Sequence, residues 1–129
     1  MPIDHELYEA YRAARPKSAA LFARAEKTLG GKSGHDLRHF APMPIYVERG
    51  KRGRKWDIDG NEYVDYFGGH GALLLGHNHP AIVEAVQEQI TKGTHYGASH
   101  ELELRWAELI TEMVPCADKV RFTGSGTES

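Results

Sequence analysis

Hydrophobic residues recur at helical spacing at the start of the chain and twice in its second half, with short β-favouring runs between. Over residues 4–29 the apolar positions keep a mostly helical interval, with Pro16 in the middle and Gly30-Gly31 at the end. This pattern predicts two short helices or one kinked helix. Residues 32–44 hold glycine, prolines and mixed charge without a period, which predicts an extended connector.

Three β-favouring runs follow the connector. They span residues 45–48, 55–58 and 62–66, and turn residues separate them at Gly50–Gly53 and at Asp59-Gly60-Asn61. The spacing predicts a three-stranded antiparallel meander, with the Asp-Gly pair as its best turn signal. A sheet of three short strands needs another layer to cover its apolar face.

The second half of the chain returns to helical periodicity. Pro80 predicts the first turn of a helix that runs to about Thr91. A second helix is expected between Ser99 and Val114, with Pro115 as its stop. Their buried stripes are predicted at Ile82, Val86 and Ile90 in the first helix, and at Leu102, Trp106, Leu109, Ile110 and Met113 in the second. Lys119–Thr123 predicts a short strand.

Composition and charge narrow the classes of partner. The chain has 129 residues, enough for one modest domain. Its 16 Lys and Arg residues nearly balance its 18 Asp and Glu residues. No basic field points to nucleic acid, and no apolar run approaches the length of a membrane span. The single cysteine, Cys116, cannot form an internal disulfide, and no secretory h-region is present. We therefore expect a cytoplasmic protein with neither nucleic-acid nor membrane partners.

The strongest candidate site is the glycine turn Thr123–Ser129. Small residues let backbone N–H groups approach an anion, and the hydroxyls of Ser125 and Thr127 add donors. No lysine follows the glycines as in a Walker loop, and the dinucleotide fingerprint is absent. A cradle for another phosphorylated ligand and a plain exit from a strand both remain open. Because the chain stops where a helix is expected to begin, we expect it to be the front piece of a longer enzyme.

Histidine, arginine and aromatic residues give weaker signals. A metal site is disfavoured because the histidines form no His-Glu-x-x-His or Cys pattern: His70, His77, His79, His95 and His100. Gly76–Pro80, with His77 and His79, is instead expected to form a tight entry into the following helix. Arg38 is either a fork for a substrate carboxylate or a solvated arginine. Trp56, Tyr63, Tyr66 and Phe67 are suited to stacking on a planar ligand or to a core, and Cys116 has no evident activating base.

Three segments together resemble the class III aminotransferases. They are Trp56-Asp57-Ile58-Asp59-Gly60-Asn61-Glu62-Tyr63-Val64-Asp65, then Leu75-Gly76-His77-Asn78-His79-Pro80, then Ser125-Gly126-Thr127-Glu128. Each segment alone is weak evidence, but all three occur in the order and spacing of that family. The similarity runs from about Leu21 to the end of the sequence. These are fold type I enzymes that use pyridoxal 5'-phosphate (PLP). The nearest likeness is to the glutamate-1-semialdehyde 2,1-aminomutase branch.

The resemblance implies an α/β fold, of which this chain is the N-terminal portion. Residues 1–70 would form a helix and meander segment that packs with the small domain, and residues 71–129 would begin the large mixed-sheet cofactor domain, truncated at the end of the chain. It also implies that Gly126 and Thr127 donate backbone groups to PLP, with Ser125 beside them.

The resemblance also implies residues for the substrate. Arg38 stands where aminomutase-like members place an arginine that meets the substrate carboxylate. His70 stands where the aminomutases carry tryptophan near the mouth of the site, and His35 where they carry serine. These two departures favour a transferase over a strict aminomutase.

Catalytic residues are not expected in this chain. The resemblance implies that the lysine that binds PLP covalently, and the aspartate that keeps its pyridine nitrogen protonated, lie beyond Ser129. The expected function of the whole enzyme is transfer of an amino group between an amino acid or amine and a keto acid. It is expected to act as a homodimer. The alternatives are a 2,1-aminomutase and, in a different class, a non-catalytic binding fragment.

Overall fold

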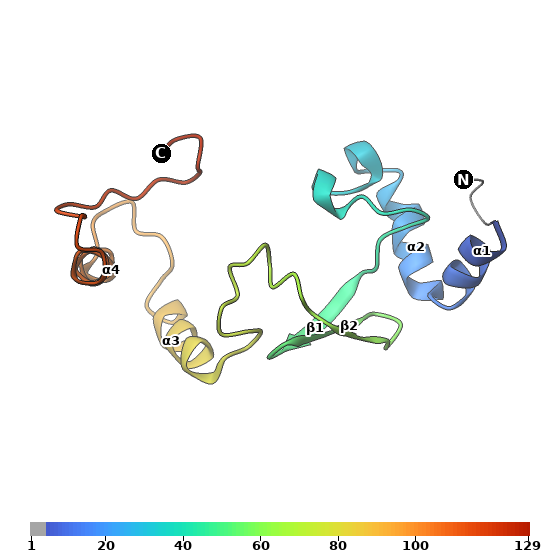
Figure 1. Cartoon of the computed structure of the whole chain (residues 1–129), viewed down its shortest axis with the longest axis horizontal. Coiled ribbons are helices and arrows are strands. Elements are labelled where there is room, and N and C mark those ends of the chain that lie inside the picture. Colours follow the sequence, from blue (N-terminus) through green and yellow to red (C-terminus); the bar gives the residue numbers. More distant parts are fainter. Residues whose placement is uncertain (1–4) are drawn as a thin grey trace. The chain divides into compact units, whose positions relative to one another are not determined.

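The computed structural model describes residues 5–129 and divides the chain into two compact units, Met1–Glu84 and Ala85–Ser129. The first unit holds helices α1 (His5–Ala13) and α2 (Pro16–Ala25), two short 3₁₀ turns, and strands β1 (Val47–Lys51), β2 (Arg54–Asp57) and β3 (Glu62–Val64). Helix α3 (Pro80–Ile90) crosses the division, and α4 (Glu101–Met113) lies in the second unit (Figure 1). The predicted boundary after residue 70 concerns the complete enzyme and stays a prediction.

Two short helices, as predicted, open the first unit. Pro16 is the first residue of α2, where its missing N–H costs no helical bond. Arg15 precedes α2 without a side-chain cap. Asp59, from the turn after β2, supplies the cap instead. Its carboxylate accepts the backbone N–H groups of Lys17 (2.7 Å) and Ser18 (2.9 Å) and the Ser18 hydroxyl (2.6 Å).

The predicted meander is confirmed. β1 pairs with β2 and β2 with β3, both antiparallel, with a bulge between Val47 and Arg49. Gly60, at a φ of +94°, closes the β2–β3 turn and donates its N–H to the carbonyl of Asp57 at 3.0 Å. Arg49 lies 3.8 Å above the ring of Trp56, which is half-buried.

The core of the first unit is small and partly polar. Met43, Ala25, Ser18 and Asp57 are the buried residues of the part of the chain that the structure describes. Asp57 is fully buried, and it accepts hydrogen bonds from Asn61 and from the Tyr63 hydroxyl. The core therefore joins α2 to the sheet through satisfied polar groups as well as through apolar contact.

Helices α3 and α4 form close to their predicted bounds, but their predicted buried stripes are wrong. The exposed fraction is 50% for Ile82, 55% for Val86 and 59% for Ile90. In α4 it is 58% for Trp106 and 70% for Met113, while Leu102 and Leu109 are exposed too. Periodicity marks an apolar face but cannot supply a layer to cover it, and residues 5–129 supply none for these faces.

The predicted strand at Lys119–Thr123 is also wrong. A strand needs a hydrogen-bonded neighbour, and no segment within residues 5–129 pairs with it. The segment instead carries Phe122, whose ring stacks on Trp106 with centroids 4.1 Å apart. None of the helices of this described range is long and apolar enough to cross a membrane.

Candidate cofactor and substrate site

The glycine turn predicted to hold phosphate folds around the side chain of Glu128. Its Oε2 accepts the backbone N–H groups of Gly124 at 2.6 Å and Ser125 at 3.1 Å. In return the N–H of Glu128 donates to the Ser125 carbonyl at 3.2 Å and, at a longer 3.4 Å, to its hydroxyl. This reciprocal Ser-x-x-Glu arrangement is a capping box, which marks the start of a helical turn at Ser125.

The capping box leaves two neighbouring donors available. The backbone N–H groups of Gly126 and Thr127 have no partner among residues 5–129, and nothing lies within 4 Å of where a Cβ on Gly126 would stand. The Glu128 carboxylate shows that N–H groups of this turn already collect an anionic oxygen. The turn thus fits a phosphate at Gly126 and Thr127, while the polar groups of Ser125 are engaged with Glu128.

Arg38 ends the second 3₁₀ turn, Asp36–Arg38, and lines a cavity of about 480 Å³. Apolar side chains form much of the wall: Leu29, Pro44, Ile45 and Val47. Lys32 also lines the cavity, but its ammonium is 2.8 Å from the Glu26 carboxylate. The guanidinium of Arg38 has no partner among the side chains that the structure describes, so it is available to a carboxylate.

His70 meets His35, which precedes Arg38 by three residues. The His35 and His70 ring centroids are 5.8 Å apart in an edge-on arrangement. Phe67 is the second aromatic neighbour of His70, and the centroids of these two rings are 4.4 Å apart. The N–H of Arg38 donates to the carbonyl of His35 at 2.9 Å. The fold thus brings the two predicted substrate residues to adjoining turns of the first unit.

A buried carboxylate positions the turn that carries His70. Asp65, with a side chain only 4% exposed, accepts Lys55 Nζ at 2.9 Å and the N–H of Phe67 at 3.2 Å. Its other oxygen lies 2.6 Å from His77 Nε2. The hydrogen bonds from Lys55, and next from His77, hold the pKa of Asp65 far below its usual value. The sequence interpretation missed this role of His77, since a single histidine carries no signal of its distant carboxylate partner.

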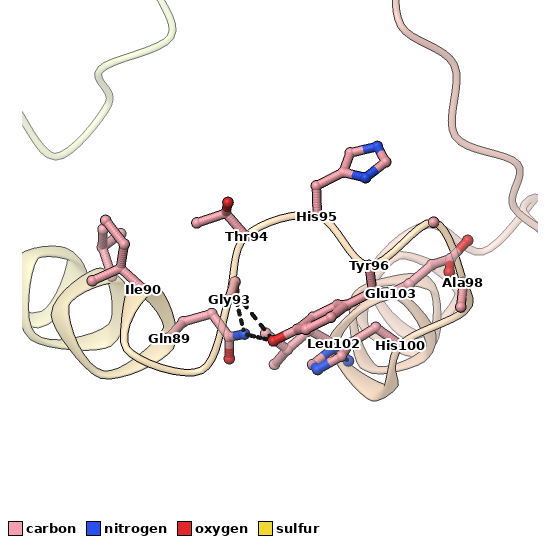
Figure 2. Close-up of a pocket in the computed structure, with 12 residues that line it drawn as sticks. Gln89, Ile90, Gly93, Thr94, His95, Tyr96, Ala98, His100, Leu102 and Glu103 are labelled. Carbon is pink, nitrogen blue, oxygen red and sulfur yellow. Dashed lines mark hydrogen bonds between the residues drawn. The ribbon is translucent and has the colours of Figure 1, made fainter.

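A second cavity, of about 500 Å³, lies in the second unit between the end of α3 and the start of α4 (Figure 2). The Tyr96 hydroxyl donates to the Lys92 carbonyl at 2.8 Å and accepts from Gln89 Nε2 at 3.2 Å. Tyr96 also stacks on His100, whose Nδ1 accepts the Leu102 N–H and caps α4. None of the predicted site residues lines this cavity, and its polar groups serve mainly to hold the loop together.

Known proteins of one family are similar to this chain in sequence and in fold. The family model of the class III aminotransferases matches residues 37–129. A glutamate-1-semialdehyde 2,1-aminomutase of Methanothermobacter thermautotrophicus is 48% identical over 113 residues, which cover 88% of this chain and 27% of the relative. The chain thus spans about a quarter of the length of the curated relatives it matches.

Solved structures give the same picture. A β-phenylalanine aminotransferase from Variovorax paradoxus superposes with a TM-score of 0.88 at 33% identity, over 95% of this chain and 29% of that one. A transaminase with PLP bound superposes with a TM-score of 0.84 at 37% identity, over 88% of this chain and 27% of that one.

The fold and these matches define a part of a PLP-dependent transferase. The chain belongs to the class III aminotransferase family. The predicted fold class, the N-terminal portion of an α/β fold type I transferase, is confirmed, and so is the expected cofactor class. The individual roles of Ser125, Gly126, Thr127, Arg38 and His70 stay predictions.

Proposed function

We propose that this chain is the part of a PLP-dependent aminotransferase that holds the cofactor phosphate and the substrate carboxylate. The enzyme would move an amino group between an amino acid or amine and a keto acid. The observation that carries the proposal is the guanidinium of Arg38, which has no side-chain partner within residues 5–129 and lines a cavity with largely apolar walls. An arginine in that setting forms two parallel hydrogen bonds with a carboxylate and so fixes the orientation of the substrate.

The turn Ser125–Glu128 would hold the cofactor. Gly126 and Thr127 offer backbone N–H groups and the Thr127 hydroxyl to the phosphate, while Ser125 and Glu128 keep the turn in shape. Bound PLP supplies an electron sink that stabilises negative charge on the substrate carbon. We further propose that the complete enzyme is a cytoplasmic homodimer, with residues 1–70 packed on its small domain and residues from 71 on beginning its cofactor domain.

Replacing Arg38 tests the substrate role in the complete holoenzyme. Arg38→Ala removes a charge-assisted pair of hydrogen bonds, so we expect KM for carboxylate-bearing donors to rise about tenfold or more. KM for plain amines should change little. Arg24→Ala, at an exposed position of α2, is the matched control. An equal rise for amines and amino acids would remove the assigned role.

The aminomutase reaction is a second candidate because the curated relatives carry that name. A 2,1-aminomutase returns the amino group to an adjacent carbon of the same molecule, whereas a transferase passes it to a separate keto acid. Incubation with ¹⁵N-labelled amino donor and an unlabelled keto acid separates the two. Label in the new amino acid supports the transferase, and an amino group found on the adjacent carbon of the original skeleton supports the aminomutase.

A further inference from the structure

One face of the three-stranded sheet carries cations that the candidate cofactor and substrate site does not use. Lys51 of β1 pairs with Arg54 of β2, and Arg54 pairs with Val64 of β3. Arg49 pairs with Trp56. Directly paired residues of antiparallel strands project on the same face, as do residues two apart on one strand. These five side chains therefore define one face, the outer face, with three cations around an indole and a valine.

The opposite face of the sheet is covered by the first two helices. Tyr63 donates there to the buried Asp57 at 2.7 Å and accepts from Arg15, the residue before α2, at 3.1 Å. On the outer face, by contrast, Val64 is 50% exposed and the three cations are exposed as well. Within residues 5–129 the outer face is thus the side of the sheet that a ligand can reach.

A cavity of about 550 Å³ lies at the β1–β2 end of the outer face. Its wall combines cationic side chains with the apolar surface of an indole and a valine, and the residues that line it are Lys51, Arg52, Gly53, Arg54, Trp56 and Val64. Sites for small molecules have volumes of roughly 300–1,000 Å³ and join apolar contact to a few placed polar groups. The cavity fits that description.

Two of the cations in its wall are available to a ligand. The Lys51 ammonium and the Arg52 guanidinium have no hydrogen-bond or ion-pair partner among residues 5–129, whereas Arg54 is paired with Glu62. The backbone of Arg52 exchanges two hydrogen bonds of 2.8 Å with His77, so the turn that carries both free charges is held in place. Neighbouring fixed cations, one of them a guanidinium fork, are well suited to phosphate.

Trp56 offers a contact for a ring. Arg49 lies 3.8 Å from the centroid of the indole and fixes its orientation, while the indole also lines the cavity. Indole rings stack on the planar bases of nucleotides. With Arg52 the surface carries four cations against the carboxylate of Glu62, an excess that suits two or three phosphate groups better than one.

We propose that the outer face of the β1–β2 hairpin binds a nucleoside di- or triphosphate. Lys51 and Arg52 would hold the phosphates. The base would lie against Trp56 and Val64. This cavity shares no lining residue with the cavity of Arg38, and the inference does not depend on the proposed function.

Equilibrium dialysis of the complete holoenzyme against labelled ATP tests the site. The holoenzyme is used because PLP then fills its own phosphate site, and a salt concentration of about 0.15 M suppresses loose attraction between charges. We expect saturable binding of one ATP or ADP per chain. Tripolyphosphate lacks the base and adenosine lacks the phosphates, so each should bind about tenfold more weakly than ATP, or weaker still.

Arg52→Gly separates binding from folding. Arg52 has a φ of +52°, which glycine adopts without strain, so the melting temperature should stay within about 3 °C of the parent. The affinity for ATP should fall about tenfold. Trp56→Leu should weaken ATP by a similar factor and leave tripolyphosphate unchanged. Lys27→Gln, at an exposed lysine after α2, is the matched control and should change neither.

The results that overturn the inference are distinct from one another. Absence of saturable ATP binding to the complete holoenzyme removes the site. Equal losses in Arg52→Gly and Lys27→Gln reduce it to general attraction between charges, and tripolyphosphate that binds as tightly as ATP removes the role of the base. None of these results bears on amino transfer by the parent enzyme, so failure of this site leaves the proposed function standing.

Discussion

At the scale of single residues, two aspartates with buried carboxylates, Asp57 and Asp65, hold the first unit together. Burial acts to raise the pKa of Asp57, but hydrogen bonds from Asn61 and Tyr63 outweigh it, and the pKa lies below its usual value. Asp65 is held lower still by Lys55 and His77. Both carboxylates are therefore charged at neutral pH, and each gathers donors from separate segments of the chain.

Acid should unfold the first unit through Asp65. The pKa of this carboxylate is lower in the folded state than in the unfolded state, where it is about 4. The carboxylate therefore stabilises the folded state at pH values above the unfolded pKa. This stabilisation is lost as the pH falls from the unfolded pKa through the folded one. We expect the urea midpoint to fall as the pH is lowered below about 4. Asp65→Asn should lower the midpoint at pH 7 and flatten this dependence.

The exposed Asp118 provides the control for this prediction. Asp118→Asn should leave both the midpoint at pH 7 and its fall in acid nearly as in the parent. Parallel curves for the parent and Asp65→Asn between pH 3 and pH 7 would contradict the role given to Asp65.

At the scale of elements, the turn before α3 docks against the meander with little free space. Arg52 and His77 exchange backbone hydrogen bonds, each of 2.8 Å, and Asn78 Nδ2 donates to the carbonyl of Gly50 at 2.8 Å. A Cβ on Gly76 would stand 2.7 Å from the Arg52 carbonyl oxygen. Glycine at 76 thus permits the close approach on which the docking depends.

Gly76→Ala should therefore destabilise the protein. Its φ of +74° and the backbone oxygen of Arg52 both oppose a side chain, so we expect a loss of roughly 1–3 kcal/mol in the free energy of unfolding. Gly53→Ala is the matched control, since nothing lies within 4 Å of an added Cβ there. Equal urea midpoints for the two variants would show that the approach at Gly76 is not tight.

Local signals explain which elements the sequence could predict. Pro16 divides the first two helices because it lacks an N–H, and Asp59-Gly60 closes the meander because glycine accepts its positive φ. The strand at Lys119–Thr123 and the buried stripes of α3 and α4 depended on partners that no local pattern specifies. Periodicity gave the element type correctly and the burial incorrectly.

The candidate site divides in the same way. Ser125–Glu128 is a local motif, and its Ser-x-x-Glu spacing carries the capping box within four residues. The contact of His35 with His70 joins residues from two turns on either side of the meander. No sequence pattern places those two rings together, because their approach depends on the folded path of the chain between the two turns.

At the scale of the whole molecule, apolar helix faces stand exposed in the part of the chain that the structure describes. Val86 and Ile90 of α3 and Leu104 and Met113 of α4 are each more than half exposed. Contiguous apolar surface of this kind is covered in most folded proteins. The curated relatives are about three times as long as this chain, so they contain further residues available to cover such faces.

The 129-residue chain on its own should therefore bind a hydrophobic dye and melt over a broad range. Val86→Asn combined with Ile90→Asn should lower the dye fluorescence, because both exposed side chains belong to one helix face. Gln87→Asn, on the same helix, should leave it unchanged. A sharp melting transition with little dye binding would show that these faces are covered after all.

The cap that Asp59 provides for α2 has a consequence for the order of synthesis. Its carboxylate bonds to Ser18 and Lys17 across separations of 41 and 42 residues. α2 thus leaves the ribosome well before Asp59 does, and its first turn stays open to fraying until the β2–β3 turn emerges. A nascent chain stalled before residue 59 should carry α2 in a protease-sensitive form, and one stalled well past it should not.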